Sequence, residues 1–251
     1  MSASDELRAF LARMLGWSNE RAVDLALRSL ALALDHRAAL VLCGDGDLVP
    51  IAWALHRHTL GADRPFIVCD PRRGTKAASV RSPASHGNGV AAFEAAIGGS
   101  LCIRSRRLPG DFPALVARLR DADDVLCAIC AAALADPRPP LVLPAPLVVP
   151  PLALRSAELD RIIAEYAGDA IDELAAPASS FTAGDHAWVR DHAAASLADI
   201  EKATLRLVAV RTSRNLSGAA ARLGMAVVSL SRWLDRRKPA PTMASDHGSH
   251  R

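Results

Sequence analysis

Apolar residues at helical spacing open the chain. One predicted helix face consists of Leu7, Phe10, Leu11 and Met14. Gly16 is placed to end this helix, and Ser18 is placed to cap a second one over about residues 19–34. The late residues of that second helix are apolar on nearly every side. The pattern predicts an N-terminal helix pair whose second member is covered by the rest of the chain.

Short apolar runs then alternate with helical segments. Strands are predicted at residues 38–43, 65–69, 100–104 and 125–131. Helices are predicted at residues 48–58 and 112–119, and residues 70–89 form a polar segment rich in turns. Alternating β and α units, with strands apolar on both faces, predict a parallel, doubly wound sheet.

The pattern is helical again beyond residue 156. The face of the first helix there consists of Leu159, Ile162, Ile163 and Tyr166. Residues 175–180 form a loop, and Thr182 begins a capping box for the next helix. Ser196 caps a long helix to about Val210, with Ile200, Leu205 and Val208 on one side. This long helix is expected either to contact a second subunit or to pack against its own chain.

Two short helices that meet at a tight turn are predicted over residues 214–237. The apolar positions of this segment are Ala219, Ala220, Leu223, Leu230 and Leu234. Gly224 permits the turn and Met225 plugs it. This is the pattern of a helix-turn-helix, in which the second helix enters the DNA major groove.

Composition narrows the class of protein. The 251 residues are 51% hydrophobic, enough for an α/β domain and a small module. No apolar run reaches the roughly 18 residues of a membrane span, and no signal peptide opens the chain. We therefore expect a cytoplasmic protein that is not attached to a membrane.

The cysteines and histidines do not predict a reactive centre. The five cysteines lie in or beside strand-like runs, where cysteine behaves as a small hydrophobe. Cys127 and Cys130 have the spacing of a redox or zinc half-site but no second pair, which favours core packing. The histidines share no metal spacing, and no catalytic triad is indicated. We expect no metal, no cofactor and no catalytic residue.

Charge is divided unevenly along the chain. Residues 201–238 contain nine basic and two acidic residues, a net charge of +7. The remaining chain contains 21 basic and 25 acidic residues, a net charge of −4. A basic module on a mildly acidic body is typical of a protein whose one end meets phosphate. A solvated surface helix is the alternative.

The turn after the first strand lacks the chemistry of a nucleotide cradle. A Walker A loop needs glycines, a lysine and a hydroxyl, in the order G-x-x-x-x-G-K-[ST]. This turn consists of Gly44, Asp45, Gly46 and Asp47, with two carboxylates and no lysine. Either the glycines serve a tight connection in which Asp47 caps the helix, or the helix N-terminus retains some binding of an anion.

Several segments resemble, in order, the sigma-54-dependent enhancer-binding activators, which are AAA+ ATPases. Residues 41–44, 47–58 and 65–69 resemble the first strand, the Walker A helix and the second strand. Residues 93–103 match the F-E-x-A-x-G-G-T-L-F-L run, and residues 149–155 resemble the P-P-L-R-E-R entry to the helical lid. The C-terminal module resembles the Fis-type helix-turn-helix. The resemblance implies an AAA+-like sheet, a lid and a DNA-binding end.

The departures from this family concern the ATPase machinery. Arg104 and Ser105 stand where the family has the Walker B Asp-Glu. Residues 70–92 are too few for the G-A-F-T-G-A loop, and residues 195–201 replace W-P-G-N-V-R-E-L. The resemblance therefore implies a degenerate scaffold without hydrolysis.

The resemblance also predicts which residues meet DNA. The predicted DNA-binding residues are Asn215, Ser217, Arg222, Ser229, Ser231, Arg232, Arg236 and Arg237. Ala226 and Val227 stand where a Fis-type domain presents asparagine and arginine, so backbone or shape readout must contribute more. Trp233 is expected in the core or a dimer contact.

These inferences combine into one expected organisation. The predicted parts are residues 1–37 (N-terminal helices), 38–151 (AAA+-like α/β domain), 152–195 (lid-like region), 196–238 (Fis-type module) and 239–251 (a disordered tail). The expected function is a regulator that binds double-stranded DNA, as a homodimer through residues 196–238. The alternatives are an interaction protein that modulates an active AAA+ activator or contacts RNA polymerase, and residual ATP binding without hydrolysis.

Overall fold

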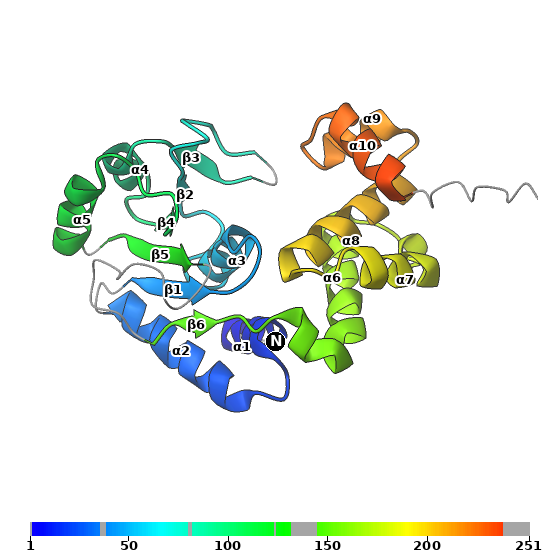
Figure 1. Cartoon of the computed structure of the whole chain (residues 1–251), viewed down its shortest axis with the longest axis horizontal. Coiled ribbons are helices and arrows are strands. Elements are labelled where there is room, and N and C mark those ends of the chain that lie inside the picture. Colours follow the sequence, from blue (N-terminus) through cyan, green and yellow to red (C-terminus); the bar gives the residue numbers. More distant parts are fainter. Residues whose placement is uncertain (1, 36–38, 80–81, 123, 132–144, 238–251) are drawn as a thin grey trace, which may run out of the picture.

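The computed structural model describes residues 2–35, 39–79, 82–122, 124–131 and 145–237. The chain forms an α/β body and a helical lobe, which are joined at the base and separated at the top (Figure 1). The predicted tail at residues 239–251 and Lys238 lie outside the described residues. No described helix has the length and apolar character needed to cross a membrane.

A parallel sheet of six strands forms the centre of the body. In the order β3-β2-β4-β5-β1-β6, every neighbouring pair is parallel. The strands are β1 (Leu40–Cys43), β2 (Phe66–Cys69), β3 (Ala84–His86), β4 (Ser100–Arg104), β5 (Leu126–Ala131) and β6 (Leu147–Val148). The four predicted strands and the parallel α/β class are confirmed. The edge strands β3 and β6 were not predicted.

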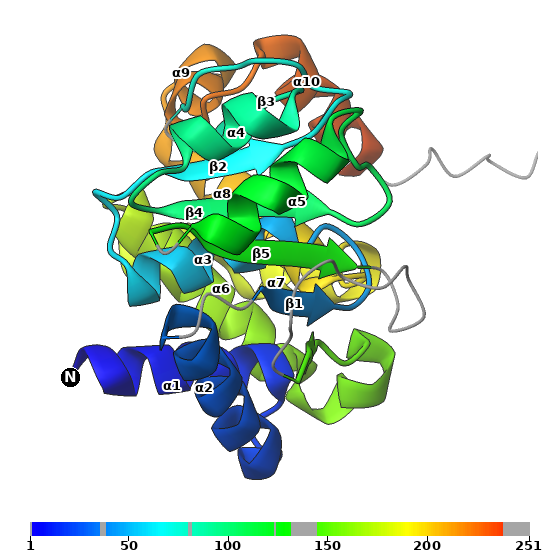
Figure 2. The same cartoon turned by 90° about the vertical axis from the view of Figure 1, so that its left-hand side faces the viewer.

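Helices cover both faces of this sheet (Figure 2). Leu40 and Leu42 of β1 face a core shared with α1 (Ala3–Leu15), α2 (Glu20–Asp35) and α3 (Val49–Thr59). Val41 and Cys43 face the opposite core, shared with α4 (Gly89–Ala95) and α5 (Phe112–Asp121). Both faces are therefore buried, as strands that are apolar on both sides require.

The N-terminal helix pair forms as predicted, with two corrections. The Ser18 cap is wrong, because the Asn19 side chain accepts a hydrogen bond from the Ala22 N–H at 3.2 Å instead. The expectation that α2 is covered holds for one side only. Leu25 and Leu32 on the other side are 47% and 46% exposed.

The helical lobe follows β6. Its elements are η1 (Leu152–Glu158), α6 (Leu159–Glu173), η2 (Ala178–Ser180), α7 (Ala183–His192), α8 (Leu197–Thr212), α9 (Leu216–Arg222) and α10 (Val227–Arg237). The predicted caps at Thr182 and Ser196 are confirmed by hydrogen bonds from the backbone N–H groups of Asp185 and Asp199, each 3.2 Å long.

Candidate nucleic-acid interface and strand-end cleft

The α9–α10 unit is built around a small apolar core. Asn215 caps α9 by accepting a hydrogen bond from the Gly218 N–H at 2.8 Å. Gly224 has φ +60°, the left-handed conformation that glycine adopts without strain. The helices close over the fully or nearly fully buried side chains of Ala219, Ala220, Leu223 and Leu230. The sequence thus produces two helices at a fixed angle.

Most of the predicted DNA-binding residues lie on the outside of this unit. Ser229, Arg232 and Arg236 are exposed and follow one face of α10 at spacings of three and four residues. Ser231 is half-buried, and the side chain of Arg237 lies outside the described residues. Asn215 and Ser217 are exposed at the start of α9. The exposed members of the predicted set share the surface formed by α10 and the start of α9.

Arg222 differs from the other predicted residues. Its guanidinium donates a hydrogen bond to Oγ1 of Thr212 at 2.6 Å and another to the carbonyl of Leu174. These contacts tie α9 to the ends of α8 and α6. The structure therefore gives Arg222 an anchoring role within the chain, and its contact with DNA stays a prediction.

Trp233 occupies the underside of α10. Its ring lies edge-to-face with Trp188 of α7, with 5.4 Å between ring centroids. The guanidinium of Arg206 lies 5.2 Å from the Trp233 centroid. These contacts agree with the expected core contact and fix α10 against α7 and α8.

Two of the three residues predicted on one side of α8 pack within the chain, and a homodimer through residues 196–238 stays a prediction. Ile200 and Val208 are both 0% exposed, because α6, α7 and α9 cover them within the same chain. The alternative, packing against its own chain, therefore accounts for this face.

The turn after β1 is packed against the helical lobe. Gly46 has φ +78°, and a Cβ added there would lie 2.7 Å from Cβ of Ser196. Asp47 accepts a hydrogen bond from the Val49 N–H at 3.2 Å, which caps the start of α3. The adjoining cavity, beside Asp45, has a volume of about 10 Å³. These contacts favour the tight connection over an anion cradle at the Gly44 turn.

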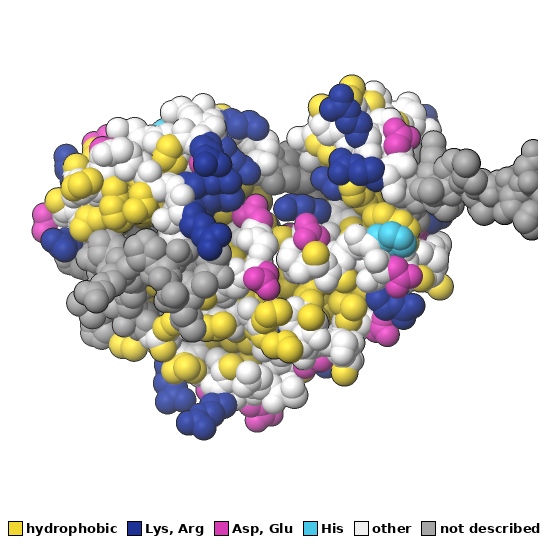
Figure 3. Space-filling view, in the orientation of Figure 1, with side chains coloured by type: hydrophobic (Ala, Val, Ile, Leu, Met, Phe, Trp, Pro, Cys, Tyr) yellow, Lys and Arg dark blue, Asp and Glu magenta, His cyan; other side chains and the backbone are white. Residues whose placement is uncertain are grey.

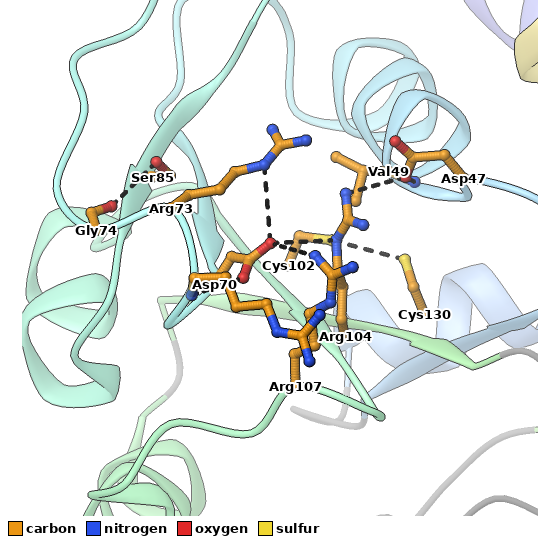
Figure 4. A network of polar contacts seen from close by, with 11 residues as sticks. Asp47, Val49, Asp70, Arg73, Gly74, Ser85, Cys102, Arg104, Arg107 and Cys130 are labelled. Carbon is orange, nitrogen blue, oxygen red and sulfur yellow. Dashed lines mark hydrogen bonds and ion pairs between the residues drawn. The ribbon is translucent and has the colours of Figure 1, made fainter.

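A network of arginines and aspartates occupies the carboxyl ends of the central strands (Figure 4). Arg104, at the end of β4, lies 3.0 Å from Oδ1 of Asp47. Asp70, which follows β2 and is fully buried, lies 3.1 Å from Arg107 and 3.7 Å from Arg73. Nε of Arg104 lies 3.9 Å from Asp70 and makes no hydrogen bond with any described residue. Arginine thus occupies the place expected for Walker B carboxylates.

This network was not predicted from the sequence. Arg104 stood out there as a departure from the family pattern, without a link to Asp70 or Asp47. A signal was present, because Asp70 and Arg104 each stand at the end of an apolar strand. The ends of parallel strands share one edge of a sheet, where α/β proteins bind ligands.

Four of the five cysteines lie in the core. Cys43, Cys69, Cys102 and Cys130 are buried and reduced. Sγ of Cys130 lies 3.6 Å from Sγ of Cys102 on the neighbouring strand. Burial raises the pKa of Cys69 to about 11, which keeps its thiol protonated. The side chain of Cys127 lies outside the described residues.

The fold defines an α/β protein with a parallel sheet and a following helical lobe. No protein-family model matches the chain, and no curated protein matches its sequence. Among solved structures, it is similar to NtrX from Brucella abortus, with 14% identity and a TM-score of 0.48 over 86% of this chain and 67% of that one. NtrX in complex with ATP gives 14% identity and a TM-score of 0.46, over 87% and 68%.

Proposed function

We propose that this chain is a DNA-binding transcriptional regulator without ATPase activity. The observation that carries the proposal is the α9–α10 unit, which presents Ser229, Arg232 and Arg236 on one exposed face. Helix α10 is 11 residues long, or about 16 Å at 1.5 Å per residue, enough to lie in a major groove. Two short helices that meet at a tight turn, with the second one exposed, support the proposal of a helix-turn-helix, which we propose to be of the Fis type.

Electrostatics support a DNA partner. The excess of basic residues lies between residues 201 and 238, the part of the chain that includes α8, α9 and α10. Arg214 is exposed before α9, and Arg232 and Arg236 are exposed on α10. Cations distributed over one end of the molecule attract a polyanion and bring this end to it first.

Sequence readout by this module depends on small apolar residues. Ala226, Val227 and Val228 are exposed at the start of α10, and the valines are 39% and 59% exposed. Apolar side chains in a major groove contact thymine methyl groups rather than hydrogen-bonding base edges. We therefore expect phosphate contacts and DNA shape to supply most of the affinity, with modest selectivity for A·T-containing sites.

Two contacts support the absence of hydrolysis. Ser196 fills the space beside Gly46, where a triphosphate would approach the turn. Arg104 places a cation where magnesium would need a carboxylate, and Asp47 is already paired with it. Asp70, the other carboxylate of the network at this edge, is paired with Arg107, so both carboxylates are engaged by arginines rather than available to a divalent cation.

A gel-shift titration of the full chain on duplex DNA at increasing salt tests the proposal. Six or so phosphate contacts predict that the logarithm of affinity falls with log salt concentration with a slope near −5. The double variant Arg232→Ala with Arg236→Ala is expected to reduce this slope by about 2 and to weaken binding to all sequences.

The matched control replaces two exposed arginines on the body, Arg21→Ala with Arg118→Ala. It carries the same charge change but leaves α10 intact, so its binding should equal that of the unchanged protein. No retention of DNA at low salt, or equal weakening by both pairs, would rule out a DNA interface on α10.

A second candidate is an interaction protein that joins an active AAA+ activator or contacts RNA polymerase. The exposed Leu25 and Leu32, seven residues apart on one side of α2, favour it, because apolar residues that lie together on a helix mark an interaction surface. Co-purification with such an ATPase, lost in Leu25→Ser with Leu32→Ser and accompanied by no DNA retention, would favour this candidate. A homodimer belongs to the first proposal, with its contact outside the buried face of α8.

A further inference from the structure

A cleft of about 330 Å³ separates the sheet edge from the helical lobe. Trp53, Arg57 and Arg104 line it from the body, and Lys202 and Arg206 line it from α8. A neighbouring cleft of about 190 Å³ shares Arg104 and adds further strand-end residues. Figure 3 shows dark-blue side chains gathered on the body beside this gap, with others on the lobe across it.

Positive charge dominates the lining of these two clefts. The cations are Arg57, Arg73, Arg104, Arg106, Arg107, Lys202 and Arg206. Three carboxylates also line them, from Asp47, Glu173 and Glu201. Asp47 is already paired with Arg104, so it does not neutralise the cations of α8. Like charges gathered in one concave region raise the local concentration of anions.

Two of these cations, Arg104 and Arg206, are not fully stabilised by hydrogen-bond acceptors or anions among the described residues. Nε of Arg104 is buried and makes no hydrogen bond with a described residue. Burial lowers the pKa of Arg206, and the charge of Arg236 lowers it further. A buried or crowded cation is stabilised by an anion that accepts its hydrogen bonds. An anion bound in the cleft would accept a hydrogen bond from Arg104 and stabilise the charge of Arg206.

We propose that this cleft binds a small phosphate-bearing compound without a divalent metal. Guanidinium groups match the oxygens of a phosphoryl group in pairs, and they can replace the magnesium that usually accompanies a polyphosphate. The half-buried ring of Trp53, with Arg57 5.0 Å from its centroid, offers a surface for a flat organic group. Gly44 and Gly46 line the neighbouring cleft, whereas the larger cleft meets this turn through Asp47.

A ligand here would contact two parts of the chain at once. Leu223, Gly224 and Met225, in the turn between α9 and α10, line the same cleft. Occupancy would therefore connect the sheet edge to the turn that sets the position of α10. An effect on DNA affinity rests on the proposed function, whereas the binding site itself does not.

Isothermal titration calorimetry of the full chain in EDTA tests the site with two probes, tripolyphosphate and ATP. We expect saturable binding of both, and tighter binding of ATP if its ring contacts Trp53. Arg57→Gln with Lys202→Gln should weaken binding by about tenfold or more, because hydrogen bonds to charged groups are lost. Glu201→Gln should strengthen it, because an anion is removed from the lining.

The control pair Arg21→Gln with Arg118→Gln should leave the affinity unchanged, since both residues are exposed away from the cleft. Circular dichroism establishes that each variant is folded. No saturable heat with either probe, equal affinity in the cleft variant, or binding that requires magnesium would overturn the proposal. Because no DNA is present, failure here leaves the DNA-binding proposal standing, and failure of the gel shift leaves this one standing.

Discussion

His56 joins helix α3 to the sheet through both of its ring nitrogens. Nδ1 lies 2.8 Å from the hydroxyl of Ser100, and Nε2 lies 3.0 Å from the carbonyl of Arg64. A carbonyl only accepts, so Nε2 carries the proton and Nδ1 accepts from Ser100. Burial lowers the pKa of His56 below its ordinary value of 6.5. The folded protein thus holds this ring neutral.

A pH dependence of stability follows from that burial. The unfolded chain takes up a proton near pH 6.5 while folded His56 does not, so its stabilisation is present above pH 6.5 and lost as the pH falls. We expect His56→Gln to cost about 1–2 kcal/mol at pH 7.5 and to reduce the loss of stability between pH 7.5 and 5.5. Urea unfolding at both pH values measures this. The exposed His192→Gln is the control, and an unchanged pH dependence in His56→Gln would contradict the assignment.

Glu201 shows the opposite effect. Burial raises its pKa above the ordinary value of 4.5, opposed by Arg57, and no ion pair with a described residue holds it. The favourable protonated form is present below pH 4.5 and is lost as the pH rises, so the charge costs stability at neutral pH. We expect Glu201→Gln to stabilise the protein at pH 7, by about 0.5–1 kcal/mol, and not at pH 4.

Thermal unfolding at the two pH values measures this gain. Glu165→Gln is the matched control, because Glu165 lines the same side of the lobe but is paired with Arg161 at 3.1 Å. It should give no gain at pH 7. Destabilisation by Glu201→Gln at pH 7 would show that Glu201 has a partner that compensates its burial.

At the scale of elements, two capping boxes of the same design differ in their surroundings. In α7, Asp185 is 1% exposed, bonds back to Thr182 at 3.0 Å and meets Arg211 of α8 at 2.6 Å. In α1, Ser2 and Asp5 form the same box at the surface. The α7 box therefore joins two helices, whereas the α1 box only begins one.

This difference predicts unequal costs for the same substitution. Asp185→Ala removes the carboxylate that accepts hydrogen bonds from Thr182 and leaves Arg211 without this partner, so we expect a loss of about 3 kcal/mol. Asp5→Ala should cost far less, because water replaces the lost contacts. Chemical denaturation of both variants checks this, and a similar small loss in both would mean that the Asp185–Arg211 pair adds nothing.

The sequence predicted the elements whose own pattern specifies them. Each of the predicted strands β1, β2, β4 and β5 contains a continuous apolar run. The caps at Thr182 and Ser196 are set by residues within one helical turn. Neither the strands nor the caps depend on distant residues. Strand β3 was not predicted because two of its three residues are polar and its pairing with β2 depends on the backbone. Strand β6 spans two residues, too short for any period.

In the candidate site, too, features set by neighbouring residues were predictable and contacts between distant residues were not. The exposed face of α10 follows from helical spacing within 11 residues, and the sequence located Ser229, Arg232 and Arg236 on it. The anchoring role of Arg222 depends on Leu174, which is 48 residues away. The network of Arg104, Asp70 and Asp47 depends on the strand order, which no local pattern contains.

At the scale of the whole molecule, one apolar core connects the two parts. It includes Leu11 of α1, Leu42 of β1, Ile163 of α6 and Leu207 of α8. Arg155 strengthens the junction, because it is 7% exposed and donates to the carbonyls at the end of α1 at 2.8 and 3.0 Å. Cations stabilise a helix C-terminus, where carbonyls lack partners. Unfolding of either part would therefore expose buried apolar side chains of the other part.

We therefore expect the body and the lobe to unfold in one transition, despite the length of the chain. Trp188→Phe with Trp233→Phe leaves Trp17 and Trp53 to report mainly on the body, and the reverse pair reports on the lobe. Urea unfolding of each variant is followed by tryptophan fluorescence and by circular dichroism, and all these transitions should coincide. Adding Ile163→Ala should lower the stability by about 2–5 kcal/mol in both, because a fully buried side chain is lost from the shared core. Two separate transitions, or a loss of stability reported by only one pair of tryptophans, would mean that the junction does not couple the body and the lobe. A ligand in the cleft would then act by closing the lobe against an independently stable body.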